Sequence, residues 1–161
     1  MIPKGNKPTT EPANYRPSIS LLEVPGKILE KIIHQRLRTD LELNTILPTT
    51  PHGFRSNRGT DTALALTTEK IAHAAGNNMR CCVVLRDVSK AFDKVWHYGL
   101  KYKLNNIGLP LIVSKILCNF LDNRTAQIAL TNAIGPPFPI NSGVPQGSSI
   151  SPSLYALYTQ V

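Results

Sequence analysis

The last 37 residues of this 161-residue chain, positions 125–161, contain no charged side chain. A folded domain rarely leaves so long a stretch uncharged unless much of it is buried or covered. Glycine and proline interrupt the stretch repeatedly, as in the segment SGVPQGSSISPS, so it is not a membrane span. We therefore expect most of these residues to pack inside a folded domain, and we expect no membrane among the partners.

Length and composition favour one folded domain with an anionic partner. The chain is long enough for one sizeable core, and its hydrophobic fraction of 42% excludes wholesale disorder. The formal net charge of +8 favours nucleic acid or a membrane surface as the partner, although a merely basic soluble protein is an equal alternative on charge alone. Cys81, Cys82 and Cys118 have no metal-ligand spacing, which indicates reduced core residues of an intracellular protein.

Apolar residues at helical spacing predict a first helix that begins near Pro25, because proline suits the first turn. Its apolar stripe, which we expect to face the core, consists of Ile28, Leu29, Ile32, Ile33 and Leu37. A second helix is predicted over residues 61–75, with Thr60 as its cap. Residues 1–18 hold four prolines and are expected to form an extended loop or a hairpin.

The pattern changes from helical to strand-like at CCVVL, residues 81–85, which predicts a short buried strand. Two helices are predicted next, over residues 100–107 and 111–121. The segments 125–130 and 138–141 are predicted strands separated by the turn GPP. A final apolar helix is predicted to begin with Ser151 as its N-cap and Pro152 in its first turn.

Asp87 follows the predicted strand directly, and Asp93 comes six residues later. A strand that ends on a carboxylate can present a metal ligand at a sheet edge, where hard ions such as Mg²⁺ prefer oxygen ligands. The same residue can instead cap a helix formed by VSKAFDKVW, and local sequence slightly favours this second interpretation.

Three further blocks carry residues suited to nucleotide or nucleic-acid contacts. In SGVPQGSSISPSL, Gly143 and Gly147 bracket a tight turn in which Gln146 can both donate and accept hydrogen bonds. Basic residues suited to phosphate contacts occur in NYRPSISLL and in HGFRSNRGTDTAL: Arg16, Arg55 and Arg58. Each block alone is weak evidence, because structural turns and solvated arginines are commoner.

In this order and at these separations, the blocks resemble the reverse transcriptase domain of non-LTR retrotransposons, the LINE-type and particularly the jockey-like elements. The matching pieces are IPKGNKP, NYRPSISLLEVPGKILEKIIHQRL, HGFRSNRGTDTAL, VVLRDVSKAFDKVWHYGLKYKL, FLDNRTAQI and SGVPQGSSISPSLYALY. The resemblance covers essentially the whole chain. The Asp-x₄-Phe-Asp block and the Gly-Val-Pro-Gln-Gly block together are highly specific.

The resemblance implies an α+β fold made of the fingers and an incomplete palm of a right-hand polymerase. Residues 1–80 would form a fingers-like region, and residues 81–161 a partial palm with inserted fingers helices. The implied function is that of an RNA-directed DNA polymerase with an RNA template, a DNA primer and dNTPs as partners. The nucleus is the implied location of the parent element, and nothing indicates an oligomeric state.

The same resemblance assigns site residues. Asp87 would be the first catalytic carboxylate and, with the Val88 carbonyl, would bind Mg²⁺ or Mn²⁺. The implied nucleotide-binding residues are Lys4, Arg16, Phe92 as the steric gate, and Gln146. The implied template- and primer-binding residues are Arg55, Arg58, Gly143, Pro145 and Gly147. We expect Asp93 to be a structural hydrogen-bond acceptor and not a metal ligand.

The sequence lacks the Tyr-x-Asp-Asp block that supplies the partner carboxylates in this family. Because one aspartate cannot hold two cations about 4 Å apart, we expect the 161-residue chain not to polymerise alone. One alternative is a non-catalytic nucleic-acid-binding remnant of a mobile element. A chain that does not fold stably is another.

Overall fold

The computed structural model describes Gly5, residues 19–44, Ile46, Gly53, residues 57–130 and residues 133–160. The chain divides into two compact units, each described by itself below. The first unit consists of Met1–Ile46 and Lys90–Val161, and the second of Leu47–Ser89. Helices and short antiparallel strands occur together in the described residues, so the fold is α+β, as predicted.

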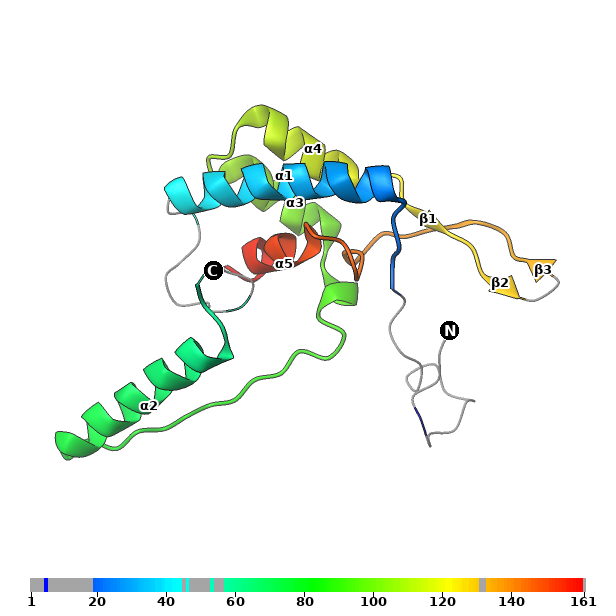
Figure 1. Ribbon diagram of the computed structural model, residues 1–161. Helices are drawn as coiled ribbons and strands as arrows, with labels where there is room; N and C mark the ends of the chain where they lie inside the picture. The colour runs from blue at the N-terminus through cyan, green and yellow to red at the C-terminus, as the bar shows by residue number, and fades with distance from the viewer. Residues whose placement is uncertain are drawn as a thin grey trace. The chain divides into compact units, whose positions relative to one another are not determined.

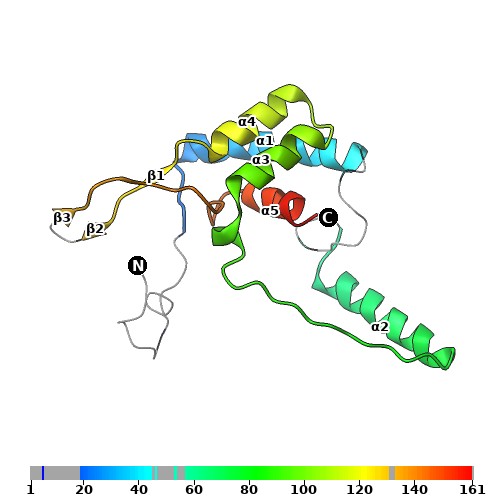
Figure 2. The same cartoon turned by 180° about the vertical axis from the view of Figure 1, so that it is seen from behind.

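The first unit is built on four helices: α1 (Val24–Leu43), α3 (His97–Asn106), α4 (Leu111–Leu121) and α5 (Ser151–Thr159) (Figure 1). Helix α3 packs against both α4 and α5, as the view from behind also shows (Figure 2). The hydrophobic core between the helices is mostly leucine: Leu37, Leu41, Leu100, Leu104, Leu117, Leu121, Leu154 and Leu157. The predicted helix 111–121 is confirmed, and that at 100–107 begins earlier, at His97.

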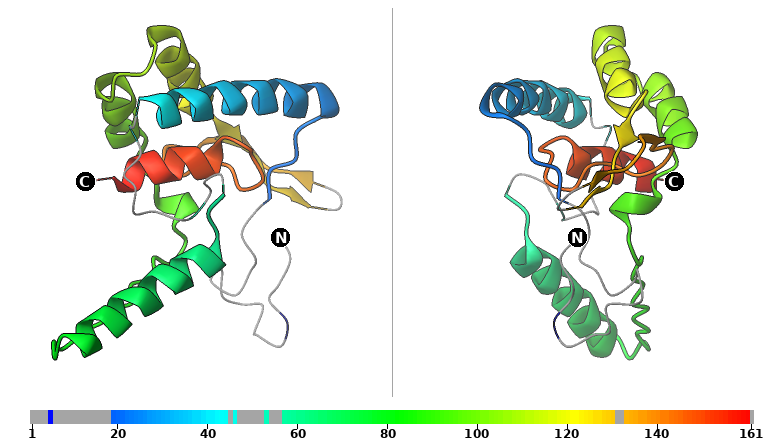
Figure 3. Two further views of the ribbon diagram at one scale, coloured as in Figure 1. Left: turned by 60° about the vertical axis from the view of Figure 1, so that its left-hand side comes forward. Right: turned by 90° about the vertical axis from the view of Figure 1, so that its right-hand side faces the viewer.

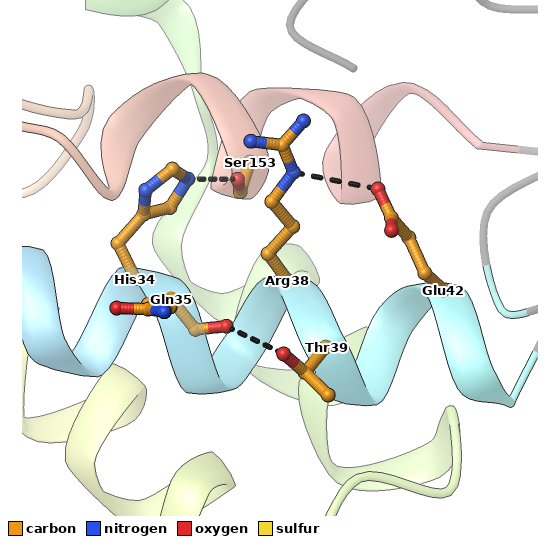
Figure 4. A network of polar contacts seen from close by, with 6 residues as sticks. All are labelled: His34, Gln35, Arg38, Thr39, Glu42 and Ser153. Carbon is orange, nitrogen blue, oxygen red and sulfur yellow. Dashed lines mark hydrogen bonds and ion pairs between the residues drawn. The ribbon is translucent and has the colours of Figure 1, made fainter. Parts of the chain in front are cut away.

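Helices α1 and α5 lie side by side and run in the same direction (Figure 3). His34 Nε2 lies 3.1 Å from Ser153 Oγ, a contact that joins the middle of α1 to the start of α5 (Figure 4). Farther along, Gln160 Nε2 donates to the Ile46 carbonyl at 3.2 Å. The face of α1 that contacts α5 and the segment before it therefore includes polar side chains.

The buried face of α1 differs from the predicted one. Leu37 is buried as expected, but Ile28, Leu29 and Ile32 are 56%, 60% and 49% exposed. The residues that are buried instead, Glu30 and Leu41, lie seven before and four after Leu37, and so share its face. The prediction was wrong for this reason: apolar content marks a stripe on a helix, but hydrogen bonding to distant residues selected another face.

Helix α5 begins at Ser151, so this serine is the first helical residue and the predicted N-cap position is taken by Ile150. Pro152 lies in the first turn, as predicted. Lys103 of α3 donates to the Tyr158 carbonyl at 2.7 Å, and a cation at this position also suits the negative end of the α5 dipole.

Four short strands form a ribbon that extends from the helices of the first unit (Figure 3). Strand β1 (Thr125–Ala126) pairs antiparallel with β4 (Phe138–Pro139), and β2 (Ala129–Leu130) with β3 (Ala133–Ile134). The chain therefore reverses between Leu130 and Ala133, and the predicted reversal at GPP is wrong. The pairing of β2 with β3 determines where the chain reverses, and the turn-forming residues alone did not predict this position.

The uncharged stretch is only partly buried. Val144, Ile150 and Leu154 are at most 3% exposed, as the absence of charge predicted. On the ribbon, however, Ile134 is 73% and Phe138 45% exposed, so that part of the prediction is wrong. No described helix has the length and apolar character needed to cross a membrane.

The second unit contains α2 (Thr60–Gly76), which confirms the predicted helix. Its N-cap is Gly59, not Thr60, and the Gly59 N–H donates to Thr62 Oγ1 at 2.9 Å. The predicted strand at residues 81–85 is absent: residues 79–88 belong to no helix or strand. Cys81 and Cys82 are exposed, which corrects the prediction that they are core residues. A strand needs a hydrogen-bonded neighbour, and the described residues of this unit contain no other strand.

Candidate functional site

The best-defined candidate site surrounds residues 143–147, which we call the GVPQG loop. Its first residues lie on the turn formed by residues 92–97, which includes the short 3₁₀ helix η2 (Phe92–Lys94). The Gly143 N–H donates to the Val95 carbonyl and the Val144 N–H to the Phe92 carbonyl, both at 2.8 Å. Backbone hydrogen bonds thus join two blocks that the sequence identified separately.

The Gly143 carbonyl accepts two side-chain hydrogen bonds, from His97 Nε2 at 2.7 Å and from Arg124 Nη1 at 3.2 Å. Because a carbonyl oxygen only accepts, the buried His97 ring must carry its proton on Nε2. Partial burial lowers the pKa of Arg124 from its usual value, yet a guanidinium in a protein stays protonated. The sequence reasoning missed both residues, although Arg124 is the last charged residue before the uncharged stretch.

Both glycines of the loop are required by its geometry. Gly143 and Gly147 have φ values of +85° and +106°, which residues with side chains rarely adopt. A Cβ atom on Gly143 would lie 3.0 Å from the Asp93 carbonyl oxygen, and one on Gly147 would lie 2.6 Å from the Ser20 carbonyl oxygen. The loop can therefore approach both neighbouring backbones only because it has no side chains at these positions.

Gln146 is fixed from two sides. Its side-chain Nε2 donates to Asp93 Oδ1 at 3.2 Å, and its backbone carbonyl accepts from the Ser20 N–H at 2.6 Å. Asp93 is thus a hydrogen-bond acceptor, as the sequence analysis expected.

Phe92 is supported by α5. Its ring stacks on the Tyr155 ring with 5.1 Å between the centroids and 26° between the planes. Such aromatic pairs add to the energy of burial and fix ring orientation. Tyr155 was not among the predicted site residues, because its place behind Phe92 depends on how α5 packs.

A cavity of about 460 Å³ opens beside the GVPQG loop. Its lining combines one cation with amide, hydroxyl and carboxylate groups, from Ser20, Asp93, Arg124, Thr125, Ser142 and Gln146. This mixture suits a polar ligand that carries both hydroxyl and anionic groups.

The structure brings together one subset of the predicted residues: Phe92, Gly143, Pro145, Gln146 and Gly147. Asp87, Val88 and Arg58 belong to the second unit. Lys4, Arg16 and Arg55 lie outside the described residues.

Asp87 is exposed, and the next helical element is η2, whose N-cap is Ala91, so the interpretation of Asp87 as a helix cap is wrong. The turn that follows starts at Lys90, whose carbonyl accepts from the N–H groups of Asp93 and Lys94 at 3.0 and 3.2 Å. Within the described ranges, no group of three or more His, Cys, Asp or Glu side chains could by itself hold a metal ion. Asp87 and Val88 alone therefore do not make a complete metal site.

Comparison with known proteins identifies the family. The family model described as "Reverse transcriptase (RNA-dependent DNA polymerase)" matches residues 2–161. The chain is 37% identical over 159 residues to the probable RNA-directed DNA polymerase from transposon X-element of Drosophila melanogaster, a match that covers 99% of this chain. It is 35% identical over 158 residues to the RNA-directed DNA polymerase from mobile element jockey of the same species, which covers 98% of this chain.

The chain spans 17% of the length of each of these two relatives. A more distant relative, the Pol polyprotein from the type-1 retrotransposable element R2 of Popillia japonica, is 28% identical over 160 residues. The family model and the relatives cover both blocks that meet at the GVPQG loop, and they agree with the resemblance drawn from the motifs. The chain belongs to the reverse transcriptase (RNA-dependent DNA polymerase) family, and its relatives include the polymerases of jockey-like non-LTR transposons.

Proposed function

We propose that this chain is the nucleotide-binding part of an RNA-directed DNA polymerase that adds dNTPs to a DNA primer on an RNA template. One observation carries the proposal: the GVPQG loop lies on the turn that contains Phe92. The Val144 N–H donates to the Phe92 carbonyl at 2.8 Å, and Gln146 donates to Asp93 at 3.2 Å. Two residues proposed as nucleotide contacts, Phe92 and Gln146, are thereby held by the same set of hydrogen bonds.

In this proposal Phe92 lies against the deoxyribose and excludes a 2′-hydroxyl, with Tyr155 stacked behind it. Gln146 binds near the sugar, and Gly143, Pro145 and Gly147 shape the surface that meets template and primer. The basic residues proposed for phosphate groups are Lys4 and Arg16 for the triphosphate, and Arg55 and Arg58 for the template.

Asp87 is the proposed catalytic carboxylate. Carboxylate and carbonyl oxygens suit Mg²⁺ or Mn²⁺, so Asp87 and the Val88 carbonyl would contribute ligands to such an ion. A divalent ion bound there would stabilise the charge that develops when a primer 3′-hydroxyl attacks the α-phosphate of a dNTP. The remaining carboxylates must come from outside this sequence, since it contains no Tyr-x-Asp-Asp block.

We further propose that residues 1–80 form a fingers-like region and residues 81–161 a partial palm with inserted fingers helices of a right-hand polymerase. The family match across residues 2–161 and the α+β character of the described residues support a reverse transcriptase domain, and the division at residue 80 follows from the resemblance of the motifs.

The test is primer extension by a protein that contains this chain together with a Tyr-x-Asp-Asp block. Asp87→Asn should lower kcat at least about 100-fold, because even indirect partners of a metal site cost roughly 10–100-fold. Asp61→Asn, which removes an exposed charge from α2 of the same unit, is the matched control and should change kcat less than about twofold.

Phe92→Val should raise the use of ribonucleotides relative to deoxyribonucleotides at least about tenfold, because a smaller side chain admits the 2′-hydroxyl. An unchanged sugar preference would remove Phe92 from the proposed site. A parent protein that extends no primer with either Mg²⁺ or Mn²⁺ would contradict the polymerase itself.

The net charge of +8 favours a second candidate, a non-catalytic module that binds RNA or DNA through phosphate groups. Such a module would bind in EDTA, lose affinity steeply with salt, and bind equally well after Asp87→Asn. A polymerase would lose its activity with the same substitution.

A further inference from the structure

Glu30 of α1 is the only acidic side chain among the described residues that is buried, at 6% exposure. A carboxylate is rarely buried without a partner, because it loses its hydration. Both of its oxygens are used: Oε1 accepts from the Ser148 hydroxyl, and Oε2 accepts from the Ser149 N–H at 3.1 Å. No cation among the described residues forms an ion pair with it. The hydrogen bonds that compensate Glu30 for its lost hydration therefore come from one short segment, residues 148–149.

These donors lie directly after the GVPQG loop. At the start of the loop, the Gly143 carbonyl accepts hydrogen bonds from His97 and Arg124, and the Gly143 N–H donates to the Val95 carbonyl. The end of the loop is held by Glu30. Glu30 and Pro145 also line a smaller cavity, of about 230 Å³, so open space adjoins the loop at this point.

We infer that Glu30 is a positioning residue, which fixes the GVPQG loop through Ser148 and Ser149 and thereby sets the place of Gln146 against an incoming nucleotide. The part of the inference that concerns the nucleotide rests on the proposed function. The part that concerns the hydrogen bonds from Ser148 and Ser149 to Glu30 does not depend on it. Glu30 contributes two acceptor atoms, and glutamine at the same position would contribute one acceptor and one NH₂ donor. The NH₂ can donate to the Ser148 hydroxyl oxygen, so Glu30→Gln keeps the size of the side chain and replaces two hydrogen bonds to a charged acceptor by two weaker neutral ones.

The first experiment measures hydrogen exchange in the 161-residue chain by mass spectrometry. In Glu30→Gln, amides of residues 143–149 should exchange about tenfold faster, while those of α3 and α4 stay unchanged. Glu42→Gln is the matched control, because Glu42 lies on the same helix and forms a partly exposed ion pair with Arg38. Unchanged exchange at residues 143–149 in Glu30→Gln would overturn the inference.

A second variant keeps the test decisive if Glu30→Gln does not fold. Ser148→Ala removes the hydroxyl that donates to Glu30 Oε1 and accepts from the Ile150 N–H at 3.2 Å, and it leaves the Ser149 N–H in place. It should accelerate exchange at the same amides, those of residues 143–149 other than Pro145. Exchange as slow as in the unaltered chain would overturn the inference.

The third experiment concerns the nucleotide. In a polymerase that contains this chain, Glu30→Gln should raise KM for dNTP about tenfold with kcat changed less than about twofold, since it disturbs binding and not the reacting groups. Glu30→Asp, which keeps the charge, should recover part of the affinity. A loosened loop with unchanged KM would overturn the inference. If the unaltered polymerase is inactive, the proposed function fails, and the exchange measurement alone decides whether Glu30 holds the loop.

Discussion

Two segments were predicted to contain site residues, and they differ in exposure and in their hydrogen bonds to the rest of the chain. Residues 80–89, the Asp87 segment, are each exposed to solvent and contain neither helix nor strand. The GVPQG loop is bonded at its start to residues 92–97 and at its end to a buried carboxylate. Each segment carries a polar residue proposed for the site, Asp87 or Gln146, and only the Asp87 segment contains an apolar run, VVL.

The difference shows what fixes a functional segment in place. The GVPQG loop and the two residues after it meet partners from three distant parts of the chain, which include Ser20, Asp93 and Glu30. The Asp87 segment has a strand-like sequence, but no described strand of its own unit pairs with it. Hydrogen bonds to other segments, and not the apolar run itself, make such a sequence rigid.

The largest expected difference between the two regions is in their leucines. Leu154→Ala should cost about 2–5 kcal/mol of unfolding free energy, because Leu154 of α5 is fully buried in the core of the first unit. Leu85→Ala should change it by less than about 0.5 kcal/mol, because Leu85 is 92% exposed. Urea unfolding followed by circular dichroism measures both. A cost above about 2 kcal/mol for Leu85→Ala would show that the Asp87 segment is a buried strand after all.

Glycines give the next comparison. Gly147→Ala should destabilise the protein by about 2–3 kcal/mol, because the residue has a φ of +106° and its Cβ would lie 2.6 Å from the Ser20 carbonyl oxygen. Gly76→Ala at the end of α2 meets no atom within 4 Å and should be neutral or slightly stabilising. Thermal unfolding of both variants checks this, and equal melting temperatures would contradict the tight fit of the loop.

A smaller effect should come from pH at the α1–α5 contact. Burial, helped by Arg38 and opposed by Glu30, lowers the pKa of His34 from its usual value of 6.5. The folded state therefore binds this proton less well than the unfolded state, so the stability from neutral His34 is present above about pH 6.5 and is lost as pH falls. In His34→Gln the loss of stability between about pH 7.5 and 5 should be smaller. An identical pH dependence in both proteins would remove His34 from this role.

The smallest expected effect concerns the cysteines. Burial raises the pKa of the Cys118 thiol on α4, so less of it is thiolate at neutral pH. Cys81 and Cys82, which are exposed in the Asp87 segment, should be alkylated first by iodoacetamide. Peptide mapping by mass spectrometry gives the order, and labelling of Cys118 should need higher pH. Faster labelling of Cys118 would contradict the difference in exposure between the two regions.

Much of this protein could be predicted from local sequence. Helix α2 followed from its helix-forming residues, α4 from the helical segment after Pro110, and Pro152 marked the first turn of α5. The glycines of the GVPQG loop indicated a turn that residues with side chains could not form, and both have positive φ. The motifs were sufficient to indicate the family, because their order and separations lie in the sequence itself.

Other features depended on partners far away in the chain. The buried face of α1 was selected by contacts with residues such as Ser148 and Ser153, which the spacing of apolar residues does not contain. The roles of His97, Arg124 and Tyr155 around the candidate site arise in the same way. The sequence determined the helices, the turn and the family, because these depend on neighbouring residues. Only the tertiary structure decided which polar groups meet, because a hydrogen bond requires two groups to be about 3 Å apart, whatever their separation in sequence.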